Sequence, residues 1–416
     1  MATHKLRALD PLLHDETNLL TDLLHEKSEF VERFYQLVAE HVEPPFAISL
    51  DGLWGTGKTT VMQLLKSKFI GGGHPIFWFN PWKYSQSTDV VLAFLQGLAK
   101  ESRSLFQEID RSKGKLFYVL LRVGLGAALK FSTQGSVSMS DVTNAFKEEE
   151  KGLPFEEYKD MIVAIEKEFK DLVNTISVEK YQSKPLIIFL DDFDRCLPQD
   201  AIKLLEALKN LFVTKDCRVI FICGIDTRVA KNFIRDHYKV TDDFAINYFR
   251  KIFNLTVSMP YSADLQTLLL KHITELYTWD DPDGKKAEKL AERLVDLGRR
   301  AEMTSVRKYL NVIHNFFAFL RFLPDYPFDL EHDFILYVQI IKEAWQPLYE
   351  KILLESLNFD KPTMATVLER VANKLAPDHE YLPLLQTGIL PLYFGEKGIF
   401  GAKKLGAVLH TYPTLT

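Results

Sequence analysis

The sequence predicts an α/β fold in which helices flank a mainly parallel sheet, followed by an all-helical C-terminal lobe. Three features predict it. Short apolar runs alternate with helix-length segments over the first 260 residues, and alternating strands and helices form parallel sheets covered on both faces. A glycine-rich loop joins the first apolar run to the helix after it. From about residue 262 onward, nearly all of the chain has a helical pattern.

The expected elements follow one another along the chain. A first helix covers residues 15–42 and ends before Pro44-Pro45. The expected strands are the apolar runs 46–51, 75–80, 185–192, 217–224 and 252–259. The expected helices between them cover about residues 58–69, 87–108, 154–178, 199–213 and 227–238. This order predicts an N-terminal helical segment, a core with an insert and a C-terminal helical domain, at residues 1–45, 46–260 (insert about 111–180) and 261–416.

Length and composition agree with a folded chain of more than one domain. The 416 residues are 47% hydrophobic and 26% charged, which favours a large core plus a smaller unit. A net charge of −5 provides no general attraction to nucleic acid. The three cysteines form no CxxC pair, and Cys217 and Cys223 are expected to lie in one strand, too far apart for a disulfide. Because the first residues lack the apolar core of a signal peptide, a reduced, intracellular protein is expected.

The insert contains LFYVLLRVGLGAALKF (116–131), which is apolar except for Arg122 and Lys130. A membrane span needs about 20 predominantly apolar residues, and a central arginine costs about 2.5–3.5 kcal/mol on insertion scales. The sequence therefore predicts no span here, but a helix packed on the insert or on a partner. A helix lying on the membrane surface is the alternative.

Residues 52–59 match the pattern G-x-x-x-x-G-K-[ST] and lie between an expected strand and an expected helix. Glycines let successive N–H groups surround phosphate oxygens, and the helix N-terminus adds a partial positive charge. Lys58 is expected to reach the β- and γ-phosphates, and the Thr59 hydroxyl to complete a Mg²⁺ shell. The residues expected to contact the nucleotide from this loop are Gly52, Trp54, Gly55, Thr56, Gly57, Lys58, Thr59 and Thr60.

The apolar run LIIFLDD (186–192) ends in two carboxylates, as a metal-binding strand beside a phosphate loop requires. Asp191 is expected to hold Mg²⁺ through water, and Asp192 to polarise the attacking water as a general base. Two adjacent acids favour hydrolysis. Asp194 and Arg195 complete DDFDR, and two interpretations stay open for them: an ion pair that fixes the loop, or a catalytic role.

Asn80 and Trp82 follow the second expected strand, at the edge where open α/β sheets bind ligands. Both are therefore expected to line a cleft near the γ-phosphate. For Trp82, as for Trp78, a place in the core or in a hinge is the alternative.

Five segments, in the same order, resemble the KAP family of P-loop NTPases over about residues 30 to 320: DGLWGTGKTT (51–60), FNPWKYS (79–85), LDDFDRCLPQDAIKLLEAL (190–208), FICGIDTRVA (221–230) and NYFRKIFNLTV (247–257). The resemblance implies an additional-strand P-loop ATPase that uses ATP and Mg²⁺. In this family nucleotide hydrolysis drives a conformational or assembly change, and bacterial members are often encoded in defence systems.

The resemblance also implies roles for single residues. Asp226 occupies the place of a sensor facing the γ-phosphate, and an N-cap for the helix beginning at Thr227 is the alternative. Arg307, in MTSVRKYLN (303–311), matches the family's basic helix, where a sensor arginine can contact phosphate. The residues expected to act in catalysis are Lys58, Asp192 and Arg307.

The sequence thus predicts a cytoplasmic ATPase that couples its nucleotide cycle to conformational change or assembly. Its expected partner is a protein effector, or other subunits of a multi-gene system, in prokaryotic anti-phage defence. A homo- or hetero-oligomer is expected, without nucleic acid and with membrane contact limited to residues 116–131. The alternative is an oligomerising scaffold or switch that depends on nucleotide but hydrolyses little of it.

Overall fold

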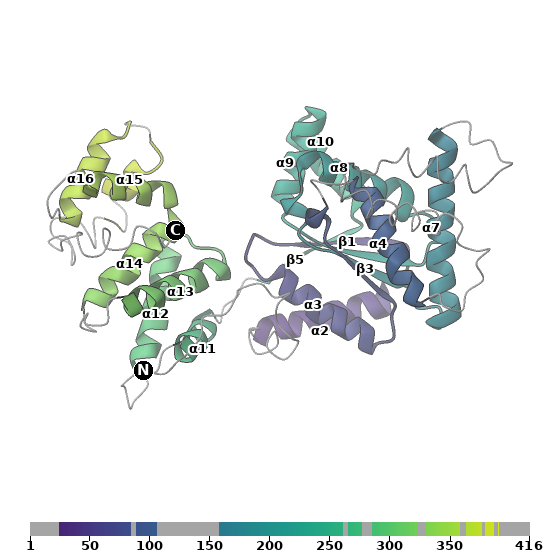
Figure 1. The fold of residues 1–416 in the computed structure, drawn as a ribbon, viewed down its shortest axis with the longest axis horizontal. Coiled ribbons are helices and arrows are strands. Elements are labelled where there is room, and N and C mark those ends of the chain that lie inside the picture. Colours follow the sequence, from purple (N-terminus) through teal and green to yellow (C-terminus); the bar gives the residue numbers. More distant parts are fainter. Residues whose placement is uncertain are drawn as a thin grey trace, which may run out of the picture. The chain divides into compact units, whose positions relative to one another are not determined.

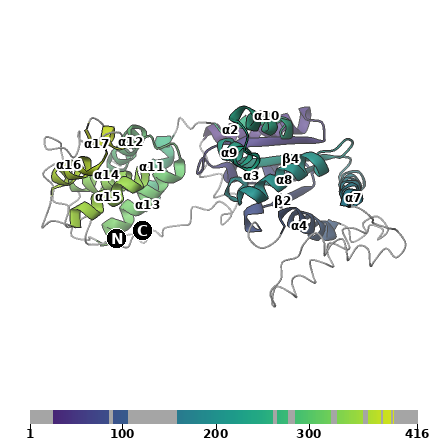
Figure 2. The ribbon, with the colours of Figure 1, turned by 90° about the horizontal axis from the view of Figure 1, so that it is seen from above.

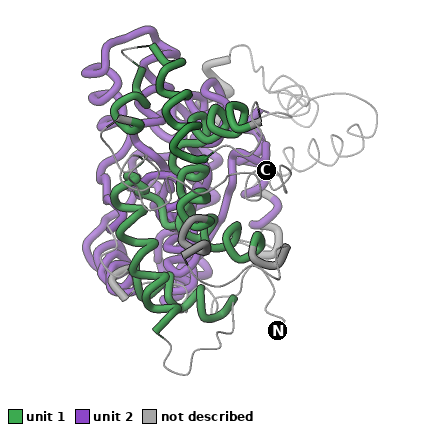
Figure 3. Tube along the Cα trace, turned by 90° about the vertical axis from the view of Figure 1, so that its left-hand side faces the viewer, with its two compact units in different colours: residues 1–9, 263–416 green, residues 10–262 purple. Residues whose placement is uncertain are grey.

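The computed structural model describes residues 25–84, 89–105, 158–260, 265–276, 285–322, 330–357, 363–376, 379–386 and 390. The chain divides into two compact units, which comprise residues 10–262 and residues 1–9 with 263–416 (Figure 3). The first unit contains the sheet. In its described part the second unit is helical.

The first unit is built on a five-stranded sheet with four parallel strand pairings (Figure 1). In spatial order the strands are β2 (Ile76–Phe79), β3 (Leu186–Leu190), β4 (Val219–Ile225), β1 (Phe46–Asp51) and β5 (Leu255–Ser258). β4 separates β1, which leads into the glycine-rich loop, from β3, which leads into the two acids. This is the additional strand that the family resemblance implies. The predicted α/β fold with a parallel sheet is confirmed.

Alternate residues of the strands pack into two layers, one on each face of the sheet. One face, with Ile48, Ile187 and Ile220, packs against α2 (His25–His41) and α3 (Lys58–Gly71). The helices that cover the other face are α4 (Val90–Leu105), α7 (Tyr158–Lys180), α8 (Pro198–Ala207), α9 (Thr227–Tyr238) and α10 (Asp242–Ile252). Because β3 and β4 are buried on both faces, each reads as an unbroken apolar run.

Helix α7 is the described part of the insert, and it packs on the core beside α4 (Figures 1 and 2). The ring centroids of Phe94 and Phe169 lie 6.4 Å apart, and Phe212 lies 4.8 and 4.6 Å from them. Residues 116–131 lie outside the described part of the chain, so the prediction for them is untested. Among the described helices, none has the length and apolar character that a membrane crossing requires.

The structure corrects the sequence analysis at residues 242–252, where no helix was expected. They form α10, so Ile252 ends a helix instead of beginning a strand. The start of α10 carries local signals: the Thr241 hydroxyl accepts a hydrogen bond from the N–H of Phe244, and two aspartates occupy the first turn.

The cysteines require a second correction. Cys217 lies in a turn before β4 and not in one strand with Cys223. All three cysteines are free and buried, and burial raises the pKa of the Cys217 thiol to about 12. A buried neutral thiol is a poor nucleophile, so the cysteines are structural.

The second unit consists of packed helices. They are α11 (Leu265–Leu276), α12 (Lys285–Arg300), α13 (Val306–Phe322), α14 (Leu330–Ala344), α15 (Gln346–Leu357), α16 (Met364–Lys374) and α17 (Leu382–Gln386). Helices that follow one another along the chain pack together, and α11 and α12 also contact α13 and α14, respectively. The closest approach involves Gly298 of α12, where an added Cβ would lie 2.2 Å from Cε1 of the buried Tyr309.

This contact predicts that Gly298→Ala destabilises the second unit. Overpacking of a well-packed core costs about 1–3 kcal/mol, and the Tyr309 ring is buried, at 2% exposure. The control is Gly71→Ala in α3, where an added Cβ meets no atom within 4 Å. Thermal unfolding of both variants checks the prediction, and equal melting temperatures would contradict it.

Candidate phosphate and magnesium site

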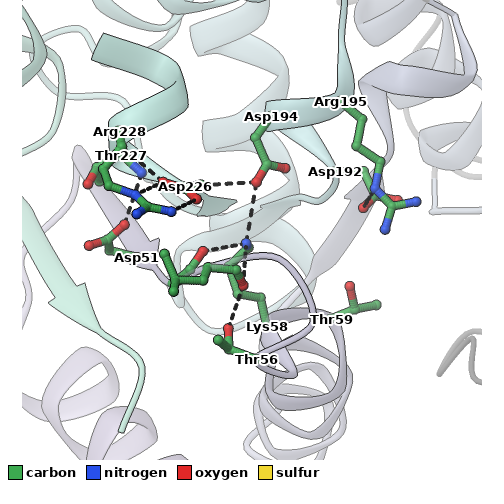
Figure 4. A network of polar contacts seen from close by, with 12 residues as sticks. Asp51, Thr56, Lys58, Thr59, Asp192, Asp194, Arg195, Asp226, Thr227 and Arg228 are labelled. Carbon is green, nitrogen blue, oxygen red and sulfur yellow. Dashed lines mark hydrogen bonds and ion pairs between the residues drawn. The ribbon is translucent and has the colours of Figure 1, made fainter. Parts of the chain in front are cut away.

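The carboxyl ends of four strands bring most of the predicted site residues to one edge of the sheet (Figure 4). β1 leads into the phosphate loop, β2 into Asn80, β3 into Asp191 and Asp192, and β4 into Asp226. Because parallel strands all end at the same edge, residues far apart in sequence meet there. All these residues belong to the first unit.

The phosphate loop uses glycine where its backbone enters the left-handed region. Gly55 has φ 78° and Gly57 has φ 91°, a conformation that costs a side-chain-bearing residue about 1 kcal/mol or more. Gly57 is the N-cap of α3 and provides no side-chain acceptor, and the first turn of α3 holds no acidic residue. The first N–H groups of α3 therefore have no side-chain cap and are available to bind an anion, which is the arrangement that binds phosphate.

Lys58 is buried and held by three oxygens. Its Nζ donates to the carbonyl of Gly52 at 2.6 Å and lies 3.4 Å from Oδ2 of Asp194, with the Leu53 carbonyl at 3.5 Å. Asp194 Oδ2 also accepts from the N–H of Asp226 at 3.1 Å. Burial raises the pKa of Asp194, and the charge of Lys58 acts in the opposite direction. A phosphate that takes Lys58 must therefore replace Asp194 as its anionic partner.

Thr59 and Asp191 lie together as a Mg²⁺ site requires. The Thr59 hydroxyl donates to Asp191 Oδ1 at 3.2 Å, and the N–H of Asp192 donates to the same oxygen at 3.0 Å. Asp191 Oδ2 is buried and has no hydrogen-bond partner among the described residues. In the described ranges, no group of three or more His, Cys, Asp or Glu could hold a metal. The residues fit Mg²⁺, which keeps several waters and takes further oxygens from phosphates.

Asp192 adopts a left-handed backbone conformation, with φ 56°, before the 3₁₀ turn η5 (Phe193–Arg195). Its Oδ2 accepts from Nδ2 of Asn80 at 3.0 Å, and its Oδ1 lies 2.8 Å from Nε of Arg195. The two ion pairs of DDFDR are thus Asp192 with Arg195 and Asp194 with Lys58. The loop-fixing pair between Asp194 and Arg195, left open by the sequence, is not the one that forms.

The sequence analysis missed a stacked cluster at this edge. The Arg195 guanidinium carbon lies 5.2 Å from the ring centroid of Trp54 and 5.3 Å from that of Trp82. Trp54 is 59% exposed and Trp82 47%, so Trp82 is not a core residue. Trp78, in contrast, stacks on the buried Phe189 with ring centroids 5.4 Å apart. No spacing rule in the sequence distinguishes these two tryptophans.

Asp226 caps helix α9, as the alternative interpretation expected. Its Oδ1 accepts from the N–H of Arg228 at 3.1 Å, and its Oδ2 lies 3.0 Å from the Arg228 guanidinium. Asp51 secures the same turn by accepting from the N–H of Thr227 at 2.9 Å. A role of Asp226 toward the γ-phosphate stays a prediction. So does the role of Arg307, which lies in α13 of the second unit.

Comparison with known proteins identifies a family for most of the chain. The family described as KAP family P-loop domain matches residues 27–323. No curated protein matches the chain at a significant level.

Several solved structures are similar to the chain at low sequence identity. ORC2 of Aeropyrum pernix, solved in ADPNP–ADP complexes, has 13% identity and a TM-score of 0.39, covering 89% of this chain and 85% of that one. Cdc6p of Pyrobaculum aerophilum has 13% identity and a TM-score of 0.41, covering 89% and 88%. A RuvB variant of Thermotoga maritima has 11% identity and a TM-score of 0.33, covering 91% of each chain.

The environment of Asp191 predicts a pH dependence of stability. Burial, and then the charge of Asp192, raise the pKa of Asp191 from 3.8 to about 7. The native state of the metal-free protein therefore binds a proton below pH 7 that the unfolded chain releases, and its stability falls as the pH rises from 4 to 7. Between pH 6 and pH 8 this one group should lower the free energy of unfolding by roughly 1–2 kcal/mol.

Chemical denaturation at both pH values, with EDTA, measures this difference. The matched variant Asp191→Asn cannot titrate at this position. Its loss of unfolding free energy between pH 6 and pH 8 should therefore be smaller than that of the wild type by the contribution of Asp191. An identical pH dependence in both proteins would contradict the prediction.

The contact of Asp194 with Lys58 makes a second prediction. Asp194→Asn keeps the acceptor for the N–H of Asp226 but removes the charge that competes with phosphate for Lys58. Nucleotide should bind more tightly, by about threefold to tenfold, which corresponds to roughly 0.7–1.4 kcal/mol. Titration with a fluorescent nucleotide measures it. The control is Asp200→Asn, which changes another buried acid outside the site; weaker binding by Asp194→Asn than by this control would contradict the prediction.

Proposed function

This chain belongs to the KAP family of P-loop NTPases, and we propose that it binds ATP with Mg²⁺ and hydrolyses it at the edge formed by β1 and β3. One observation carries the proposal. Asp191 accepts hydrogen bonds from the hydroxyl of Thr59, in the first turn after the phosphate loop, and from the backbone N–H of Asp192. Phosphoryl transfer to water needs groups that bind the phosphates, oxygens that bind the metal ion and an acid that activates water. Lys58, the pair Thr59 and Asp191, and Asp192 are suited to these three roles.

Each part has a separate task in the proposed reaction. The N–H groups of the loop and Lys58 bind the β- and γ-phosphates, and Thr59 and Asp191 hold Mg²⁺. Bound Mg²⁺ supplies positive charge to the phosphate oxygens. Asp192 orients a water in line with the γ-phosphorus, and one of its carboxylate oxygens accepts the proton as the water oxygen attacks. The β–γ bridging bond then breaks, leaving ADP and inorganic phosphate.

The contacts within the site support a second candidate function. Both carboxylate oxygens of Asp192 already contact protein donors, and Lys58 already has an anionic partner. Such a site favours slow turnover, as in a nucleotide-dependent switch that signals by assembly. In either case we propose that the nucleotide state controls a protein effector. The family resemblance favours a prokaryotic anti-phage defence system as the setting.

Two substitutions separate binding from hydrolysis. Lys58→Ala should weaken nucleotide binding by about tenfold or more, because a charge-assisted phosphate contact is lost.

Asp192→Asn should bind nucleotide normally but hydrolyse it about 100-fold more slowly, as expected for loss of a general base. Asp236→Asn, which changes an exposed acid on α9, is the control. Normal turnover in the Asp192→Asn protein would refute the proposed mechanism.

Size-exclusion chromatography with and without ATP and Mg²⁺ distinguishes the two functions. A large change in assembly state with negligible turnover in the wild type favours the switch. Sustained turnover that is lost in Asp192→Asn favours the ATPase.

A further inference from the structure

Arg195 contacts the proposed general base from an unusual setting, between two tryptophans. Its guanidinium carbon lies 5.2 Å from the Trp54 ring and 5.3 Å from the Trp82 ring. Trp54 belongs to the phosphate loop, and Trp82 to the 3₁₀ turn η2 (Pro81–Lys83) that follows β2. The guanidinium therefore joins two segments that are separate in sequence, and it does so next to Asp192.

The carboxylate of Asp192 does not align the guanidinium through a hydrogen bond from Nε. Nε of Arg195 lies 2.8 Å from Asp192 Oδ1, yet this N–H is not aligned for a hydrogen bond with any group in the described residues. A carboxylate that alone positioned an arginine would align with its planar fork. The two rings lie at similar distances from the guanidinium carbon, and each attracts the cation through its face. The rings thus hold the arginine, and the arginine limits where the carboxylate can lie.

The second carboxylate oxygen of Asp192 is restrained by the segment that follows β2, which also carries Trp82. Asn80 donates to Asp192 Oδ2 at 3.0 Å, and Asn80 immediately precedes the turn that carries Trp82. Asp192 is 14% exposed and has a left-handed backbone conformation. Its side chain therefore depends on these two contacts for its direction.

We propose that Arg195 is a positioning residue for Asp192 and that Trp54 and Trp82 form the aromatic clamp that holds Arg195 in place. The proposal rests on the proposed hydrolysis and adds to it a group that never touches the nucleotide phosphates. It explains two exposed tryptophans at one site edge. It also connects the phosphate loop, through Trp54, to the residue that activates water.

The test compares Trp82→Ala with Trp82→Phe and Arg195→Lys. Phenylalanine keeps a ring face and should retain kcat within about twofold, since it still offers a cation–π surface. Alanine removes that face, and lysine has no flat guanidinium to stack. Both should lower kcat by about tenfold, with nucleotide affinity unchanged within about twofold, because the loss falls on the transition state only. Tyr84→Ala is the matched control, because Tyr84 is a partly exposed aromatic that stacks on Phe79.

The outcomes separate the clamp from the reaction. A fall in kcat for Trp82→Ala and Arg195→Lys that phenylalanine restores, at constant nucleotide affinity, supports the clamp. Wild-type kcat in Trp82→Ala would overturn it, as would an equal loss in Trp82→Phe or in Tyr84→Ala. A wild-type chain that binds ATP without turnover would overturn the proposed hydrolysis and the positioning role with it.

Discussion

The ion pair between Lys58 and Asp194 is the interaction on which the arrangement of the site depends. Both side chains are almost fully buried, at 8% and 3% exposure. A buried charge whose partner is removed is strongly destabilising, so Lys58 can leave Asp194 only for another anion. Phosphate oxygens at the N-terminus of α3 are such an anion. Lys58 therefore has an anionic partner both before and after a nucleotide binds, and binding requires that it exchange Asp194 for phosphate.

The same polar network connects the ends of the strands. Asp194, which contacts Lys58, also accepts the N–H of Asp226 at the end of β4. Asp192 contacts Asn80 after β2 and Arg195 in the 3₁₀ turn after β3. Residues 191 to 195 thus contact the loop after β1 and the ends of two further strands (Figure 4). A displacement of Asp194 by nucleotide would act on the turn that also carries Asp192 and Arg195, and would thereby link nucleotide binding to the proposed activation of water.

The sequence predicted the strands because buried parallel strands read as unbroken apolar runs, as LIIFL does in β3. It predicted the phosphate loop and the paired acids because their spacing follows from the chemistry of phosphate and Mg²⁺. It did not predict which acid pairs with Arg195. That choice depends on a 3₁₀ turn, which brings residues i and i+3 together, and on the left-handed backbone of Asp192. Nor did it predict that Trp82 is exposed while Trp78 packs on Phe189, because both follow the same aromatic pattern.

The most direct test of this account is a crystal structure of the chain with Mg²⁺ and a non-hydrolysable ATP analogue. The account predicts Lys58 Nζ within about 3 Å of a phosphate oxygen, with Asp194 no longer its nearest anion. It also predicts Mg²⁺ beside Thr59 and Asp191. A triphosphate bound elsewhere, with Lys58 still paired to Asp194, would contradict it.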